Sequence, residues 1–429
     1  MKHETGLSYA RQKDTGDPLA HYRDEFHLPL NKGGTPLVYF CGHSLGLQPK
    51  SAAGIVEQEM EDWRRLGVYG HFSGTRPWLS YHEQLTEMTA SLVGAEPAEI
   101  VSMNTLTVNL HLLMVSFYRP TRERHKILIE SPTFPSDRYA VESQIKWHGF
   151  DPREALLLAE PRDGEALIRS EDLESLIDRH GDSIALILLP GVQYYTGQVF
   201  DMPRIVQLGH KKGCVVGFDL AHGAGNLELA LHDWDADFAV WCSYKYLNGG
   251  PGAVAACFVN ARYARSFDIP RFAGWWGHDK DTRFQMGPEF HAIPGAEGWQ
   301  LSNPAVLSMA PVLASLEIFE SATMEALVQK SRELTGYLEF LVGEYLDEQI
   351  EILTPDNPAR RGCQLSLRVK GKGNKGQELF GALENNGVVC DWREPDVIRA
   401  APVPLYNRFE EVFQFVEILR QELAAPGPQ

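Results

Sequence analysis

The stretch Trp241-Cys-Ser-Tyr-Lys-Tyr-Leu-Asn-Gly-Gly-Pro-Gly252 joins the end of an apolar run to a glycine-rich turn, with a lysine between them. The run Phe238–Trp241 is short and apolar, which is typical of a strand buried on both faces of a sheet. At that position Lys245 would be partly removed from water, which favours the neutral amine that attacks an aldehyde. A strand-end lysine can also simply extend into solvent. The neighbouring motifs must therefore distinguish a reactive lysine from a solvent-exposed one.

Further apolar runs on both sides of this stretch predict a mostly parallel sheet. Segments with helical periodicity lie between many of them, and this alternation predicts an α/β fold with helices on both faces of the sheet. The expected strands are Ile127–Glu130, Ala155–Leu158, Ile184–Leu189, Cys214–Asp219, Phe238–Trp241 and Ala253–Val259, and the expected helices include Asp137–Trp147, Glu171–Arg179 and Pro203–Lys211.

After Asn303 the pattern changes to two long helices followed by short strands, which predicts a smaller C-terminal α/β lobe. The helices are expected over Pro304–Ser321 and Met324–Glu348, and the strands over Glu351–Leu353, Cys363–Val369 and Val388–Asp391. We therefore expect three parts: an N-terminal segment 1–85 that contributes to the small lobe and the substrate pocket, a large cofactor-binding domain 86–310, and a small domain 311–429.

Composition excludes several classes of protein. The 429 residues carry 40 Lys+Arg against 57 Asp+Glu, and this net charge of −17 disfavours binding to nucleic acid and to anionic membranes. The six cysteines have neither C-x-x-C pairs nor metal-ligand spacing, which is typical of reduced thiols in a cytoplasmic protein without a metal site. The segment from Met1 to Phe26 is rich in charge, so we expect neither a secretory signal nor a membrane anchor.

A carboxylate at a second strand end gives Lys245 a chemical context. Asp219 closes the expected strand Cys214–Asp219, and His222 follows it in Phe218-Asp-Leu-Ala-His222. Pyridoxal 5′-phosphate (PLP) needs such a pair: an amine that holds its aldehyde, and an anion that keeps its pyridine nitrogen protonated. Asp219 could instead cap a helix, and His222 could be an ordinary half-buried histidine.

The phosphate of such a cofactor requires donors, and the start of a helix provides free N–H groups. Asn104-Thr-Leu-Thr-Val-Asn109 opens a helical pattern with hydroxyl and amide side chains in its first turn. Thr107 is the expected phosphate ligand, although the same residues could be ordinary helix caps.

Taken together, these motifs resemble the kynureninase family, whose members have the fold-type I PLP-dependent transferase fold. The resemblance runs from Phe26-His-Leu-Pro29 to Ala401-Pro-Val-Pro404, in the same order along the chain. It rests on five further stretches: Leu106-Thr-Val-Asn-Leu-His111, Phe134-Pro-Ser-Asp137, Phe218-Asp-Leu-Ala-His222, Cys242-Ser-Tyr-Lys-Tyr-Leu-Asn248 and Leu301-Ser-Asn-Pro304.

The resemblance implies roles for individual residues. Lys245 would be the Schiff-base lysine, Asp219 the partner of the pyridine nitrogen, and Tyr244 a further acid or base. Phe134 would stack on the ring. The residues implied around the cofactor and its phosphate, some of them reaching across a homodimer interface, are Leu106, Thr107, Phe134, Ser136, Asp137, Asp219, His222, Tyr244, Lys245, Trp275 and Asn303.

The resemblance also implies a substrate site and an activity. Arg399 would bind the carboxylate of an amino acid, which suits its planar fork of donors. His71, Ser302 and Asn303 would hold the substrate's aromatic ring. The implied reaction is the hydrolysis of L-kynurenine or its 3-hydroxy form to an anthranilate and L-alanine, a step of tryptophan catabolism by the kynurenine pathway toward NAD. Two positions depart from the family pattern: Pro190 stands where a Ser or Thr is common, and His43 replaces an Asn.

Three other activities remain open at this point. Gly42-His-Ser-Leu-Gly46 matches the nucleophile elbow of serine hydrolases and lies between an expected strand, Leu37–Cys41, and an expected helix, Ser51–Leu66. Few strands precede Ser44, which argues against that class. Cysteine desulfurases share the PLP fold and use a mobile cysteine, for which Cys363 could be considered, and aminotransferases use almost the same cofactor machinery.

Overall fold

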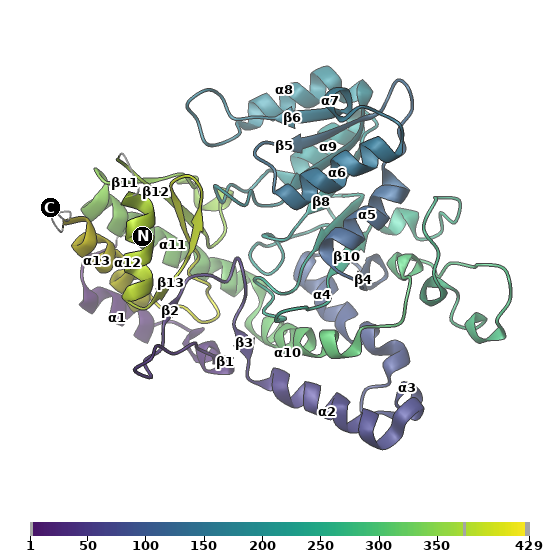
Figure 1. Cartoon of the computed structure of the whole chain (residues 1–429), viewed down its shortest axis with the longest axis horizontal. Coiled ribbons are helices and arrows are strands. Elements are labelled where there is room, and N and C mark those ends of the chain that lie inside the picture. The colour runs from purple at the N-terminus through teal and green to yellow at the C-terminus, as the bar shows by residue number, and fades with distance from the viewer. Residues whose placement is uncertain (1–2, 372–374, 425–429) are drawn as a thin grey trace.

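The computed structural model describes residues 3–371 and 375–424, which form two lobes lying side by side (Figure 1). The larger lobe contains a seven-stranded sheet in the order β4-β10-β9-β8-β7-β5-β6. Strands β5 to β9 run parallel, and β10 is antiparallel to both of its neighbours. The strands are β4 (Ile100–Ser102), β5 (Lys126–Glu130), β6 (Leu156–Ala159), β7 (Ile184–Pro190), β8 (Val215–Asp219), β9 (Phe238–Trp241) and β10 (Ala256–Val259).

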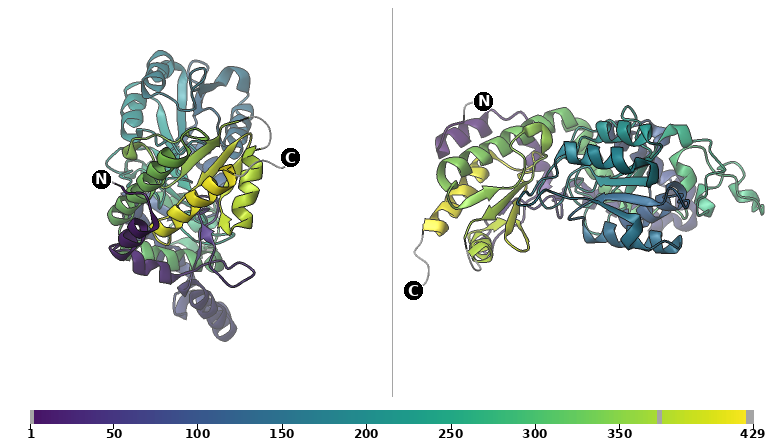
Figure 2. Two further views of the ribbon diagram at one scale, coloured as in Figure 1. Left: turned by 90° about the vertical axis from the view of Figure 1, so that its left-hand side faces the viewer. Right: turned by 90° about the horizontal axis from the view of Figure 1, so that it is seen from above.

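Helices cover both faces of this sheet, as the view from above shows (Figure 2). Alternate residues of each strand point to opposite faces, so that Ile127 and Ile129 pack with α5 and α6 while Leu128 packs in the cluster that contains α8 and α9. This arrangement confirms the predicted α/β fold. The helices of the large lobe are α4 (Thr86–Val93), α5 (Leu106–Phe117), α6 (Pro135–Trp147), α7 (Pro152–Ala155), α8 (Ser170–His180), α9 (Met202–Lys211) and α10 (Val306–Ala322).

The smaller lobe is built around a four-stranded antiparallel sheet in the order β11-β12-β15-β14. N-terminal residues take part in it: Ala10 and Phe40 belong to the same apolar core as the C-terminal helices. The elements are α1 (Leu7–Thr15), α11 (Met324–Leu346), α12 (Lys375–Asn385), α13 (Phe409–Ala424), β11 (Ile350–Ile352), β12 (Leu365–Val369), β14 (Asp391–Arg393) and β15 (Val397–Ala400). Two small sheets complete the chain, the antiparallel pair β1 (Phe26–His27) with β3 (Gln48–Pro49) and the parallel pair β2 (Val38–Tyr39) with β13 (Val388–Val389).

Two segments project from the large lobe. One, which we call the helical arm, consists of α2 (Ser51–Leu66) and α3 (Gly70–Ser73) and extends away from both sheets (Figure 1). The other, the aromatic loop, covers residues 265–295 and contains only short helical turns. Both expose large apolar side chains, namely Met60, Trp63, Val68, Tyr69 and Phe72 on the arm and Phe267, Phe272, Trp275, Phe284, Met286 and Phe290 on the loop.

Some expected elements differ from the structure. The run Val388–Asp391 is not one strand, because β13 pairs with β2 and β14 pairs with β15, in two different sheets. Strands β4 and β15 are additional to the expected set. In the described part of the chain no single helix is long and apolar enough to cross a membrane; α10 and α11 pass that test only as a pair, and they are bent by 82° relative to each other.

Candidate active site

Lys245 lies in a tight turn directly after β9, and a second turn packs against it. Asn248 N donates to Lys245 O at 3.0 Å, and Gly46 N donates to Tyr244 O at 2.8 Å. A side chain at position 46 would overlap with Lys245 O and with Asn248 Oδ1, so only glycine allows this approach. Gly46 therefore allows this turn to pack against the lysine turn, whereas Gly42 packs against Tyr406 and Val403.

Asp219 ends β8, the strand beside β9, and two further carboxyl groups lie close to it. Its Oδ1 accepts a hydrogen bond from Ala221 N at 2.7 Å. Burial, followed by the neighbouring charge of Asp219, raises the pKa of Asp137 well above its ordinary value. Burial is also the main cause that raises the pKa of Glu130, at the end of β5, to about 8. The three carboxyl groups thus form a buried acidic cluster, which a cation placed among them would stabilise.

An aromatic ring and the lysine amine face each other beside this cluster. Lys245 Nζ lies 5.7 Å from the centre of the Phe134 ring, and Phe134 directly precedes α6. His222 lies on the segment after β8 and is buried, and its Nδ1 has no hydrogen-bond partner among the described residues. Burial, and after it the charge of Lys245, lowers the pKa of His222 well below its ordinary value, so its imidazole is neutral.

The first turns of α5 and α6 meet at the expected phosphate position. Thr107 Oγ1, on α5, and Ser136 Oγ, on α6, are 2.9 Å apart. Leu106 is the first residue of α5, and the unpaired N–H groups of both helix starts favour an anion here. The structure therefore brings the predicted pair Thr107 and Ser136 together.

Arg399 is almost fully buried and connects the two lobes. Its Nε lies 2.8 Å from Asp391 Oδ1 on β14, and its Nη1 donates to Tyr194 O, in the loop after β7, at 2.7 Å. The ring of Tyr194 is 5.3 Å from the ring of Phe134, with the two planes at 75°. Arg399 is thus linked through Tyr194 to the ring that faces Lys245.

The remaining predicted residues do not join this group. His71 contacts Trp78 at a ring distance of 5.4 Å, and Trp275 Nε1 donates to Arg283 O at 3.1 Å. Over residues 3–371 and 375–424, no hydrogen bond or ring contact connects His71, Trp275, Ser302 or Asn303 to Lys245, Asp219 or Arg399. Tyr244 lies beside Lys245, with Lys245 Nζ 6.0 Å from its ring centre, and its ring is partly exposed.

Sequence reasoning missed Glu130, Tyr194 and Asp391. Glu130 had a usable signal, because it closes a buried strand in the same way as Asp219 does. Tyr194 and Asp391 had none, since their role depends on how the two lobes meet. Pro190 lies opposite Asp219 in the register of β7 and β8, and Gly191 N donates to Asp219 O at 2.9 Å. The Gly191 N–H is used in this backbone bond, so the described part of the chain shows no donor that replaces the hydroxyl absent at Pro190.

The rival nucleophiles are placed poorly for catalysis. Ser44 follows β2, which belongs to a two-stranded pair outside the central sheet. Cys363 is buried, and its N–H donates to Asn226 Oδ1 at 2.9 Å, so it does not lie on a mobile loop. Burial raises the pKa of its thiol to about 12, which keeps it protonated.

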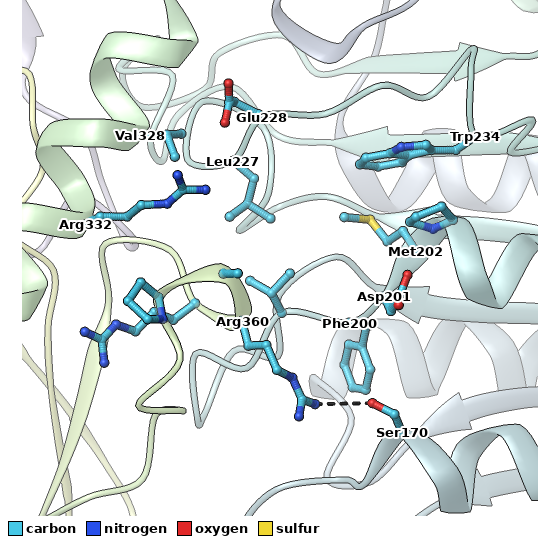
Figure 3. A pocket seen from close by; sticks show the side chains of 15 residues that line it. Ser170, Phe200, Asp201, Met202, Leu227, Glu228, Trp234, Val328, Arg332 and Arg360 are labelled. Atoms are coloured by element: carbon cyan, nitrogen blue, oxygen red, sulfur yellow. Dashed lines mark hydrogen bonds between the residues drawn. The ribbon is translucent and has the colours of Figure 1, made fainter.

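A separate cavity of about 450 Å³ lies between the lobes and contains none of the predicted site residues. Phe200, Leu227 and Trp234 line it from the large lobe, and Val328, Arg332 and Arg360 line it from the C-terminal part of the chain (Figure 3).

The residues present fit PLP. Asp137 Oδ1 and His222 Nδ1 are buried without a partner among the described residues, and both would gain one from a polar aromatic ring in this space. The acidic cluster suits a protonated pyridine nitrogen, Phe134 offers a ring face, and Thr107 with Ser136 offers hydroxyl donors for a phosphate. Lys245 offers the amine.

Comparison with solved structures shows the fold family. The chain superposes on the cysteine desulfurase CsdA of Escherichia coli with a TM-score of 0.75, covering 94% of this chain and 98% of that one at 17% sequence identity. It superposes on the cystine C–S lyase C-DES with a TM-score of 0.73, covering 90% and 97%, also at 17% identity. These superpositions show that the chain has the fold-type I PLP-dependent transferase fold.

Sequence relatives give the family. A kynureninase from Koribacter versatilis is 59% identical over 96% of this chain and 97% of its own length, and one from Myxococcus xanthus is 57% identical over 97% of both. A third, from Flavobacterium psychrophilum, is 51% identical over 98% and 99%. The family model for the kynureninase C-terminal domain matches residues 327–419. The chain belongs to the kynureninase family, which confirms the predicted resemblance.

Proposed function

We propose that this enzyme cleaves the Cβ–Cγ bond of L-kynurenine or 3-hydroxy-L-kynurenine with water, releasing anthranilate or 3-hydroxyanthranilate together with L-alanine. The observation that carries the proposal is that relatives named kynureninase match nearly the full chain at 51% to 59% identity. The contacts of Lys245 with Phe134 and of Arg399 with Tyr194 support it. The reaction would belong to tryptophan catabolism in the cytoplasm.

Bound PLP supplies an aldehyde for the substrate amine and a ring that accepts electrons from Cα. Lys245 Nζ would bind the aldehyde of the cofactor and, when free, would take the proton from Cα. Asp219 would hold a proton on the pyridine nitrogen, and the neighbouring Asp137, whose raised pKa keeps it protonated, would leave the negative charge on Asp219. Phe134 would orient the ring by stacking, and Tyr244 is our candidate for the later proton transfers beside Lys245.

Arg399 would hold the α-carboxylate of the substrate. Its position between the lobes supports this role, because Tyr194 and Asp391 orient its guanidinium from opposite sides. With its carboxylate on Arg399, a substrate would extend past the Phe134 ring and direct its amine toward Lys245.

We also propose a homodimer in which each copy completes the site of the other. The helical arm and the aromatic loop expose apolar side chains at the end of the large lobe that lies away from the small lobe (Figure 1), and a second copy is the simplest partner that would bury them. His71 lies on the arm and Trp275 on the loop, so both would reach the partner's cofactor and substrate.

The function is tested by incubating purified enzyme and PLP with kynurenine and with 3-hydroxykynurenine. We expect the fluorescence of the anthranilate product to appear in step with L-alanine, and Lys245→Ala to abolish both. Sulfide release from cysteine without any cleavage of kynurenine would instead identify a desulfurase and overturn the proposal.

A further inference from the structure

His43 is buried in the site without any role in the machinery described above. Its side chain is 1% exposed, and neither Nδ1 nor Nε2 has a hydrogen-bond partner in the described part of the chain. A buried polar group left unpaired costs about 1–3 kcal/mol, so an imidazole with two such atoms indicates a missing partner.

The ring of His43 lies between the arginine and the lysine ends of the site. A ring nitrogen of His43, an oxygen of Asp391 and Cys41 Sγ all lie within 4.8 Å of one another. The same Asp391 carboxylate holds Arg399 Nε at 2.8 Å. On the other side, the ring centre of His43 is 6.3 Å from that of His222. His43 therefore lies between His222 and the Asp391 carboxylate that holds Arg399.

The guanidinium of Arg399 does not offer two free nitrogens to a substrate carboxylate. Two of its three nitrogens already bind the protein, since Nε pairs with Asp391 and Nη1 donates to Tyr194 O. Among the described residues, only Nη2 has no protein partner. A carboxylate has two oxygens, so a second donor is needed for the oxygen that Nη2 does not bind.

Burial and the surrounding charges keep the imidazole of His43 neutral, with one N–H that can donate a hydrogen bond. Burial, followed by the charges of Arg399, Arg393 and Lys245, lowers its pKa well below the ordinary value. Asp391 is the carboxylate next to it, and both Arg399 and Arg393 pair with Asp391. A neutral imidazole still carries one N–H, which it can donate to an anion.

A metal ion is a poorer occupant of the same place. Cys41, His43 and Asp391 have the spacing of metal ligands, but two arginines repel a cation there. Burial also raises the pKa of the Cys41 thiol to about 11, so the thiolate that a metal requires is scarce.

We propose that His43 donates the second hydrogen bond to the α-carboxylate of the bound amino acid, beside Nη2 of Arg399. The proposal rests on the proposed function, because it assumes an α-amino acid substrate. It assigns to His43, where the family commonly has Asn, a direct part in substrate binding. An Asn side chain can also donate, so His43→Asn should conserve the contact and His43→Leu should remove it.

The test uses the PLP-loaded enzyme and the product L-alanine, whose binding changes the visible spectrum of the cofactor. We expect His43→Leu to weaken the apparent affinity for L-alanine about 10- to 100-fold, as the loss of a hydrogen bond to a charged group predicts, and His43→Asn to stay within about threefold. Ethylamine has the amine without the carboxylate, so its binding should change less than about threefold in every variant.

Turnover provides a second readout that is independent of the spectrum. KM for kynurenine should rise in His43→Leu while kcat changes little, because a contact made equally in ground and transition states alters binding alone. If His43→Leu does not take up PLP, His43→Phe, which keeps the ring without the donor, takes its place. Unchanged L-alanine affinity, or an equal loss for L-alanine and ethylamine, overturns the proposal.

The two proposals fail in different ways. If the wild-type enzyme leaves kynurenine intact but His43→Leu still weakens L-alanine selectively, the proposed function falls and the carboxylate contact stands. If the wild-type enzyme cleaves kynurenine and His43→Leu binds L-alanine normally, the contact falls and the function stands.

Discussion

The acidic cluster formed by Glu130, Asp137 and Asp219 shows how single residues prepare this site for a cation. Each side chain is buried, burial raises the pKa of all three carboxyl groups, and the charge of Asp219 raises the pKa of Glu130 and of Asp137 further. The cluster therefore keeps more protons in the folded chain than in the unfolded one at neutral pH. Such a cluster costs stability unless a positively charged ligand is bound among its members.

The pH dependence of the cofactor-free protein should reveal this cost. The pKa of Glu130 rises from its ordinary 4.5 to about 8 on folding. The folded state therefore binds the extra proton between these values, and the unfolding free energy falls as pH rises from about 5 to 8, by on the order of 5 kcal/mol at most.

Glu130→Gln should reduce this slope in urea denaturation curves measured at several pH values. The slope should not vanish, since Asp137 contributes in the same direction. A slope identical to that of the wild-type protein would contradict the placement of Glu130 in the cluster.

Lys245 should carry the cofactor chromophore. In Lys245→Ala we expect the visible absorbance of the bound cofactor to disappear, because no amine in the described site replaces the one lost. Circular dichroism in the far ultraviolet should stay unchanged, which would show that the variant is folded. A persistent visible band would assign the cofactor to another lysine.

Sequence patterns correctly predicted the helices and strands that their own residues define. The predicted strand Phe238–Trp241 matches β9, the predicted helix Ser51–Leu66 matches α2, and Lys245 and Asp219 follow neighbouring strands as expected. The patterns failed for β4, for β15 and for the split between β13 and β14. These short strands are stabilised by partners far away in the sequence, so nothing in their own residues defines them.

The same limit explains the site residues that the sequence did not reveal. Tyr194 and Asp391 act on Arg399 only because β15 comes to lie against the loop after β7. A pattern within either segment contains no information about that contact. His43 was visible only as a departure from a family motif, and its burial beside Asp391 gives that departure a physical meaning.

The contact between the turn that contains Gly46 and the turn that contains Lys245 can be tested by mutation. Gly46→Ala should place a methyl group against Lys245 O and Asn248 Oδ1, and we expect a loss of about 1–3 kcal/mol in unfolding free energy together with weaker PLP binding. Gly54→Ala is the matched control. It lies in α2 with open space around its Cα, so it should be neutral or stabilise by about 0.5–1 kcal/mol. Equal effects of the two changes would refute a role for close packing at Gly46.

The molecule as a whole has a large lobe with two apolar projections and a small lobe that provides Arg399. The lobes meet at the site, whereas the aromatic loop lies at the far end of the large lobe and the helical arm runs along its lower edge to α3 (Figure 1). The large exposed side chains on the helical arm and the aromatic loop are unusual for the surface of a monomer. Assembly and catalysis should therefore be coupled.

A charge introduced on the arm tests this coupling. Trp63 is 58% exposed on α2, and we expect Trp63→Glu to shift the sedimentation of the enzyme from dimer toward monomer and to reduce activity in parallel. Leu30 is 59% exposed but lies outside both projections, so Leu30→Glu should change neither property. A Trp63→Glu variant that remains dimeric and fully active would exclude the arm from the interface.

If His71 and Trp275 on the projections reach the partner's site, their position has a genetic consequence. A copy that lacks Lys245 and a copy that lacks Trp275 would each be inactive alone. Paired with each other, they would form one site with both defects and one with none, so random mixing should restore about a quarter of normal activity. Two defective alleles of this enzyme could thus complement each other in a single cell.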